Sequence, residues 1–140
     1  YYSIDELEPF LKGLPYFYEK YGEDAEIIIK KTDLPVLLDS IKKLKKHDLF
    51  INKKFEFSKI SDELLKGNIV IVIINTKILE GLKGYNGHFV VITGIDDENV
   101  FYHDSGPKNP TPNKKVKRAL FESAWNDKNT GNDVLIVRKK

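Results

Sequence analysis

A histidine and an aspartate bracket the segment of the chain that is best suited to chemistry. It runs from Asn86 to Gly106 and reads NGHFVVITGIDDENVFYHDSG. A histidine acts as a base when a carboxylate accepts a hydrogen bond from one ring nitrogen, because that bond fixes the tautomer and leaves the other nitrogen for a nucleophile. His88 and Asp104 could thus be two members of a catalytic triad. An ordinary β-hairpin with an incidental histidine is the commoner origin of such spacing.

The register of this hairpin decides whether the two side chains share a face, since side chains alternate along each strand. A two-residue turn at Asp97–Glu98 places Asp104 opposite Val91, on the other face from His88. A three-residue loop over Asp96–Glu98 puts Asp104 opposite Val90, on the His88 face and diagonal to His88. A triad therefore predicts a loop of odd length, or a bulge that has the same effect.

The chain holds no candidate for the nucleophile of such a triad. Its 140 residues include no cysteine, which excludes disulfides and thiolate metal sites, and they include no methionine. Ser105 directly follows Asp104 and cannot also face His88 along a regular strand, and no nucleophile-elbow motif is present. A start methionine is normally trimmed only before a small residue, so a chain that begins with Tyr1 is expected to be a fragment or a processed form.

Composition and charge indicate one globular domain over residues 1–140. Hydrophobic residues make up 41% of the chain and charged residues 31%, and 23 basic residues nearly balance 21 acidic ones. A net charge of +2 gives no reason to expect a nucleic acid or an anionic membrane as partner. The longest apolar run, Ile69–Ile74, is far too short to span a membrane, and no secretory signal is visible, which slightly favours a cytoplasmic location.

The other titratable residues give no cofactor or metal site. His88 and His103 lack a third ligand at metal-binding spacing, and the acidic turn Asp96–Glu98 lacks the ligand spacing and the glycine of a calcium loop. We therefore expect neither a cofactor nor a metal ion.

The first half of the chain is predicted to be mainly helical. A capping box in Ser3–Glu6 opens a helix that Gly13 and Pro15 end. The elements expected next are one or two helical turns over Tyr16–Tyr21, a strand over Glu26–Lys30, a helix capped by Thr32 or Asp33 with an apolar stripe from Leu34 to Leu44, and a strand over Leu49–Asn52.

The second half is predicted to be mainly strands. IVIVIIN (Ile69–Asn75) is continuously apolar and β-branched, which predicts a central strand covered on both faces. The other elements expected are a short helix from Ser58 or Ser61 to Gly67, strands over Phe89–Ile95 and Val100–His103, a loop over Gly106–Asn113, a helix over Val116–Trp125 with Leu120, Phe121 and Ala124 inward, and a strand over Asp133–Arg138. Helices followed by consecutive hairpin strands predict an α+β fold with a mainly antiparallel sheet.

The segment GHFVVITGIDDENVFYHDSG resembles the signature that carries the histidine and aspartate of papain-like cysteine peptidases of the double-glycine leader type and their peptidase-like relatives. Three further stretches are similar to that family: IVIVIIN before the histidine loop, the late helix Phe121–Trp125, and Tyr1–Leu7, which resembles the stretch after the nucleophile helix. The resemblance covers nearly the whole chain, and the segment from His88 to Asp104 is its specific part.

The resemblance implies a papain-like fold in which His88 is the general base and Asp104 orients it. In that family a cysteine opens a helix, and a glutamine a few residues earlier helps to form the oxyanion hole. Both would lie upstream of Tyr1, in a missing N-terminal segment expected to pack beside His88. The implied reaction is cleavage of a peptide or related amide bond through a Cys-His-Asp triad.

The same resemblance implies a peptide or protein as substrate and suggests residues that contact it. Tyr85, Asn86 and Gly87 directly precede His88 and are expected to line the substrate cleft, and Asn75 is expected to face it from the end of its strand. Two alternatives stay open: a non-catalytic binding or regulatory module that lacks a nucleophile, and a plain structural domain in which His88 is incidental.

Overall fold

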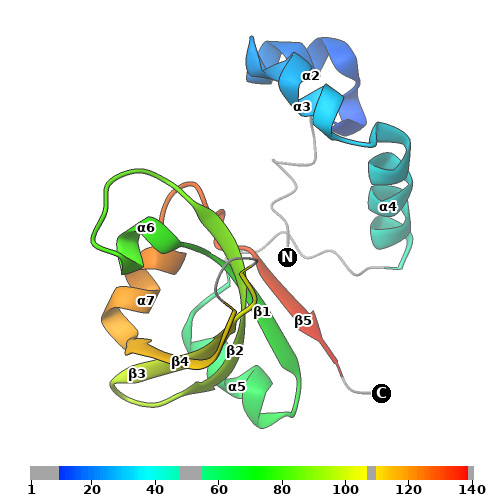
Figure 1. Cartoon of the computed structure of the whole chain (residues 1–140). Helices are drawn as coiled ribbons and strands as arrows, with labels where there is room; N and C mark the ends of the chain where they lie inside the picture. The colour runs from blue at the N-terminus through cyan, green and yellow to red at the C-terminus, as the bar shows by residue number, and fades with distance from the viewer. Residues whose placement is uncertain (1–9, 48–54, 107–109, 139–140) are drawn as a thin grey trace. The chain divides into compact units, whose positions relative to one another are not determined.

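The computed structural model describes residues 10–47, 55–106 and 110–138. The chain divides into two compact units, Tyr1–Lys53 and Lys54–Lys140 (Figure 1). The expectation that the whole chain forms a single domain stays a prediction. The capping box in Ser3–Glu6 and the strand over Leu49–Asn52 fall outside the described residues.

The first unit contains three described helices, α2 (Leu14–Tyr21), α3 (Asp24–Lys31) and α4 (Leu34–Lys46). Asp33 caps α4, since its side chain accepts a hydrogen bond of 3.2 Å from the Val36 N–H. This confirms the expected helix and one of the two caps proposed for it. Aromatic packing stabilises α2, because buried Phe17 packs against Tyr21 at 4.6 Å between ring centroids.

The strand predicted over Glu26–Lys30 is wrong, because these residues belong to α3. The run of three isoleucines suggested a β-strand, but a short apolar run cannot be distinguished from a buried helical segment by periodicity. The helix buries Ala25 completely and leaves Ile27 53% exposed. Helical packing around Ala25 therefore outweighs the β-propensity of the isoleucines.

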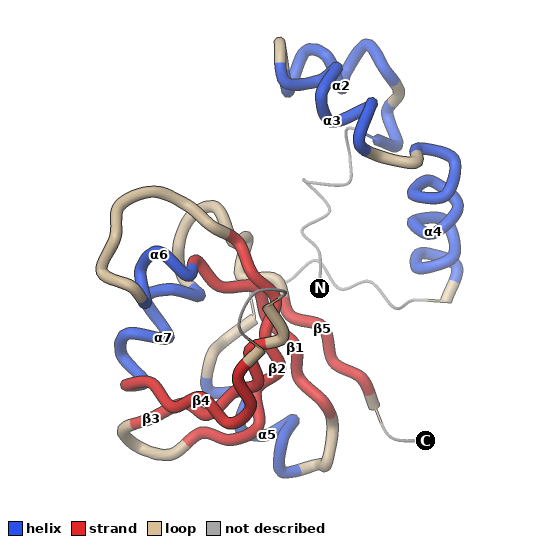
Figure 2. The backbone as a smooth tube through the Cα atoms, viewed as in Figure 1, coloured by secondary structure: helices blue, strands red, loops and turns tan. Residues whose placement is uncertain are grey.

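The second unit is built on a five-stranded antiparallel sheet of order β4-β3-β2-β1-β5 (Figure 2). Its strands are β1 (Ile69–Asn75), β2 (Gly87–Ile95), β3 (Asn99–Asp104), β4 (Thr111–Lys117) and β5 (Val134–Val137), and its helices are α5 (Ser58–Leu65), α6 (Thr76–Leu79) and α7 (Arg118–Trp125). Helices followed by an antiparallel sheet confirm the predicted α+β class.

The core of this unit lies between one face of the sheet and the helices α5 and α7 (Figure 1). Alternate residues of the strands are buried there, among them Val72 and Tyr102, as the two-residue period of a strand requires. Tyr102 meets Phe121 of α7 at 5.4 Å between ring centroids. This packing fixes which face of β2 and β3 is inward, and hence the direction of the side chains at their ends.

Two burial predictions are wrong. The strand β1 is fully buried on one face, where Val70, Val72 and Ile74 are inaccessible, whereas on the other face Ile71 and Ile73 are half-buried and Ile69 is 50% exposed. A continuous run of β-branched residues therefore does not by itself establish cover on both faces. Leu120, expected inward, is 38% exposed, because α7 turns Phe121 and its neighbours Ala124 and Trp125 to the sheet instead.

The end of the loop predicted over Gly106–Asn113 and the helix start predicted at Val116 are also wrong, because β4 occupies Thr111–Lys117 and α7 begins at Arg118. Residues 107–109 of that loop fall outside the described residues. The strand β4 lies at the sheet edge and is largely exposed, with three lysines and a proline. Lysine and proline are the residues that edge strands tolerate, and they leave no apolar alternation to detect.

Candidate functional site

The hairpin of β2 and β3 contains the bulge that a shared face for His88 and Asp104 requires. A hydrogen bond from the Asp96 N–H to the Asn99 carbonyl closes a two-residue turn, and Gly94 pairs with Phe101. The register then shifts between Ile92 and Gly94, so that Thr93 has no partner on β3.

Beyond the bulge, Val90 pairs with Asp104. The two-residue turn alone would have put Asp104 opposite Val91, and the bulge at Thr93 reverses that outcome. The prediction of a bulge with the effect of an odd loop is confirmed.

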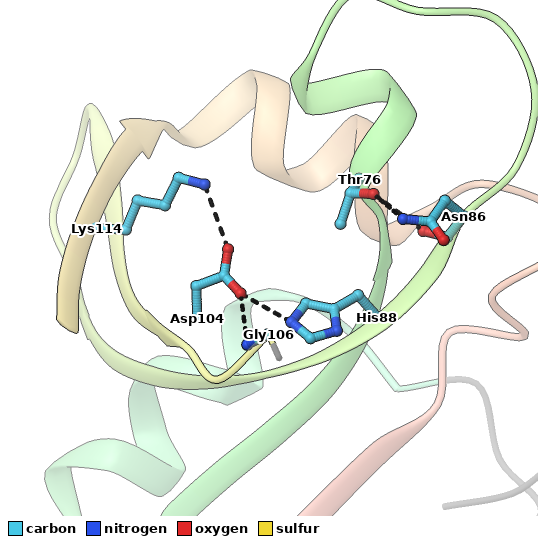
Figure 3. Close-up of polar contacts among 6 residues, drawn as sticks. All are labelled: Thr76, Asn86, His88, Asp104, Gly106 and Lys114. Carbon is cyan, nitrogen blue, oxygen red and sulfur yellow. Dashed lines mark hydrogen bonds and ion pairs between the residues drawn. The ribbon is translucent and has the colours of Figure 1, made fainter. Parts of the chain in front are cut away.

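The two side chains form a direct hydrogen bond. His88 Nε2 lies 2.8 Å from Asp104 Oδ1, and the side chains are 24% and 17% exposed (Figure 3). Because the carboxylate accepts the Nε2–H, the ring takes the tautomer in which Nδ1 carries the lone pair. Among the described residues Nδ1 has no hydrogen-bond partner. The arrangement can take a proton at Nδ1 while the carboxylate stabilises the resulting cation.

Two further groups hold the Asp104 carboxylate. The Gly106 N–H donates to Oδ1 at 3.1 Å, and Lys114 Nζ lies 3.3 Å from Oδ2 (Figure 3). Partial burial alone would raise the pKa of Asp104, but the hydrogen bonds from Gly106, His88 and Lys114 together lower it below its ordinary value. The carboxyl is therefore charged at neutral pH, as an orienting group for an imidazole must be.

Gly106 fits this site because it has no side chain. A Cβ at that position would lie 3.1 Å from Asp104 Oδ1 and 3.6 Å from His88 Nε2. The first distance is shorter than an ordinary carbon–oxygen contact, so the glycine lets the backbone N–H approach the carboxylate. Sequence reasoning did not single out Gly106 or Lys114. The DSG turn after Asp104 was the available signal for the glycine, and nothing in the polar run 111–117 pointed to the lysine.

Asn75 is a structural residue at the end of β1. It is 1% exposed, and its Oδ1 accepts hydrogen bonds from the N–H groups of Lys77 at 3.1 Å and Asn86 at 3.0 Å. Its amide donates to the Gly84 carbonyl at 3.0 Å and to Asp127 Oδ2 at 3.3 Å. These four contacts favour a role in holding the loop before His88. The expected contact of Asn75 with substrate stays a prediction, and the burial of its side chain disfavours that contact.

The residues directly before His88 are tied to the start of α6. Asn86 Nδ2 donates to Thr76 Oγ1 at 2.6 Å, and the Asn86 carbonyl accepts from the Thr76 N–H at 3.0 Å (Figure 3). A Cβ on Gly87 would collide with the Tyr85 hydroxyl and lie 3.3 Å from Ile73 Cδ1. Gly87 and His88 are adjacent on β2, so Tyr85 covers the face opposite to the imidazole. Substrate contact by Tyr85, Asn86 and Gly87 stays a prediction.

His103 lies outside this cluster, next to Asp104 on β3. Its Nδ1 accepts a hydrogen bond of 3.0 Å from the Asn113 N–H, which is a structural role at the edge of the sheet. Within residues 10–47, 55–106 and 110–138, no group of three or more His, Cys, Asp or Glu side chains is placed to hold a metal ion.

Comparison with known families matches the chain to one of them. The model of the Peptidase C39-like family matches residues 28–132, which is most of the chain. The chain belongs to the Peptidase C39-like family. No curated protein and no solved structure matches it significantly.

Membership places this Peptidase C39-like chain in the papain-like cysteine peptidase superfamily, and its helices followed by an antiparallel sheet agree with that fold. The resemblance stated from the sequence is therefore confirmed. The family implies a peptide as substrate. None of the helices that the structure describes is both long enough and apolar enough to cross a membrane.

Proposed function

We propose that this Peptidase C39-like chain supplies the base and the orienting carboxylate of a cysteine peptidase-like hydrolase that cleaves a peptide or related amide bond. One observation carries the proposal: His88 Nε2 is bound to Asp104 Oδ1 at 2.8 Å, which leaves Nδ1 as the basic nitrogen. The nucleophile would be a cysteine upstream of Tyr1, since these 140 residues contain none.

The reaction follows from the direction of that hydrogen bond. Nδ1 of His88 accepts the thiol proton, and Asp104 stabilises the imidazolium that forms. The thiolate attacks the carbonyl carbon, and the amine leaves with the proton from Nδ1, which gives a thioester. Nδ1 then takes a proton from water as the water attacks the thioester, and it returns that proton to the thiolate as the carboxylic acid leaves.

The first experiment is to read the natural coding frame upstream of Tyr1 and to treat the longer protein with iodoacetamide at neutral pH. We expect one rapidly labelled cysteine near the start of a helix, because a paired thiolate reacts faster than an ordinary thiol. His88→Ala should slow the labelling strongly. His103→Ala, which changes the neighbouring histidine on the opposite face, is the matched control and should leave the rate unchanged.

A frame without such a cysteine, or labelling that does not respond to His88→Ala, contradicts this proposal. The alternative is a non-catalytic binding or regulatory module, which the lack of cysteine in these 140 residues favours. It predicts that peptides bind the longer protein without being cleaved and that His88→Ala leaves the fold intact.

A further inference from the structure

Lys114 is the additional residue that contacts the His88–Asp104 pair. On the edge strand β4 it pairs with Tyr102, which is two positions before Asp104 on β3. Side chains two apart on a strand share a face, so Lys114 and Asp104 lie diagonally across the two strands. The ammonium reaches Asp104 Oδ2 at 3.3 Å and lies 5.9 Å from the centroid of the Tyr102 ring.

The two oxygens of Asp104 have separate partners. Oδ1 accepts from His88 Nε2 and from the Gly106 N–H, whereas Oδ2 faces Lys114 (Figure 3). A carboxylate without a partner for Oδ2 could rotate and exchange its oxygens, or accept a proton there. We infer that Lys114 is a positioning residue that keeps Asp104 ionised and keeps Oδ1 directed to His88. The functional meaning of this inference rests on the proposed function, but its test does not.

The charged surroundings of Asp104 support this assignment. The titratable groups that interact with it are His88 from β2, Tyr102 from β3 and Lys114 from β4. Lys115 lies on the other face of β4, with its ammonium over the Phe101 ring at 5.6 Å. Lys117 pairs with Glu98 at the turn end of the hairpin. Among the described residues, the basic side chain that forms an ion pair with Asp104 is therefore that of Lys114.

Electrostatics predict the direction in which Lys114 changes the pKa of Asp104. Burial alone would lower the pKa of Lys114, but Tyr102 and Asp104 raise it, so Lys114 is a cation throughout the neutral range. A cation beside Oδ2 lowers the pKa of Asp104 and keeps the carboxylate available to His88 as the solution becomes acidic. Removing the cation should make the carboxylate accept a proton at a higher pH.

The test follows the side-chain carboxyl carbon of Asp104 by NMR during a pH titration of the 140-residue chain. Lys114→Met should raise the pKa of Asp104 towards its ordinary value. Lys115→Met removes the same net charge from the same strand on the other face and should leave that pKa at the wild-type value. Lys114→Gln removes the charge with a polar side chain and should repeat the Lys114→Met result, and amide spectra confirm that each variant is folded.

Equal pKa values in all variants would overturn the inference, as would an equal rise in Lys114→Met and Lys115→Met, which would indicate only a change in net charge. The titration needs neither a nucleophile nor activity, so it stands apart from the cysteine-labelling test. In a longer protein that does cleave peptides, Lys114→Met should also move the acidic limb of the kcat/KM profile to higher pH, whereas Lys115→Met should not.

Discussion

His88 Nε2 and Asp104 Oδ1 lie 2.8 Å apart on one face of the sheet because Thr93, which lies between them in sequence, is left without a partner on β3. The turn at the far end of the hairpin would by itself direct the two side chains to opposite faces. The site therefore depends on backbone pairing at a distance from the reacting atoms as well as on the residues that form it.

Asp104→Asn should remove a contribution to stability that depends on pH. The folded-state pKa of Asp104 is lowered, so its stabilising effect is present above the ordinary carboxyl pKa and is lost as the pH falls through the folded value. In urea unfolding we expect the variant to be less stable by roughly 1 kcal/mol at neutral pH, with the gap closing as the pH falls below the ordinary carboxyl pKa.

Asp97→Asn, which removes a carboxylate from the exposed turn, is the control for this comparison and should change the free energy of unfolding little. A constant gap between wild type and Asp104→Asn across the pH range would show that the carboxylate gains nothing from its partners.

Gly106→Ala should destabilise the protein by roughly 1 kcal/mol, because the added Cβ crowds Asp104 Oδ1 at 3.1 Å. Gly94→Ala is the matched control: its Cβ would meet Phe101 at 3.6 Å, an ordinary contact, and should be neutral or slightly stabilising. Thermal unfolding of both variants measures the difference. Similar melting temperatures for the two would contradict the crowding.

Asn75→Ala should cost roughly 2 kcal/mol in the free energy of unfolding, because it removes a buried amide with four hydrogen-bond partners and leaves the N–H groups of Lys77 and Asn86 without their acceptor. Asn126→Ala, at an exposed position, is the control and should cost much less. Urea unfolding compares them. A cost for Asn75→Ala no larger than that of the control would rule out the structural role assigned to Asn75.

Gly87→Ala should cost roughly 1 kcal/mol, because its Cβ would collide with the Tyr85 ring, whose Cζ would lie 2.9 Å away. Replacing Tyr85 with alanine removes the obstacle, so the double variant should lose less stability than the sum of the single variants. The readout is a double-mutant cycle of unfolding free energies. Additive losses would mean that the ring does not cover Gly87.

The sequence predicted the strands β1, β2, β3 and β5, the helix α4 and the antiparallel α+β class, because these elements have strong apolar patterns. It also predicted that His88 and Asp104 need a bulge or an odd loop to share a face. Which of the two occurs depends on the pairing of Thr93 with β3, and the only signal for a bulge in this strand was the glycine beside it, Gly94.

The failures have the same physical origin. The exposed edge strand β4 carries polar residues that give no periodic signal, so both the strand and its contribution to the site, Lys114, were missed. The isoleucines of α3 were assigned by β-propensity, which packing around Ala25 overrides. Local patterns identify elements that bury a face, and they say little about segments whose position depends on neighbours distant in sequence.

The bulge at Thr93 makes the site sensitive to whether the segment between Val90 and Asp104 holds an odd or an even number of residues. Adding or removing two residues at the turn lengthens or shortens the ladder by one pair and leaves both side chains on the same side. A change of one residue separates them, unless the strand gains or loses an unpaired position. Relatives that keep this histidine and aspartate should therefore differ in the length of this segment by even numbers, or carry their own change in bulge or turn.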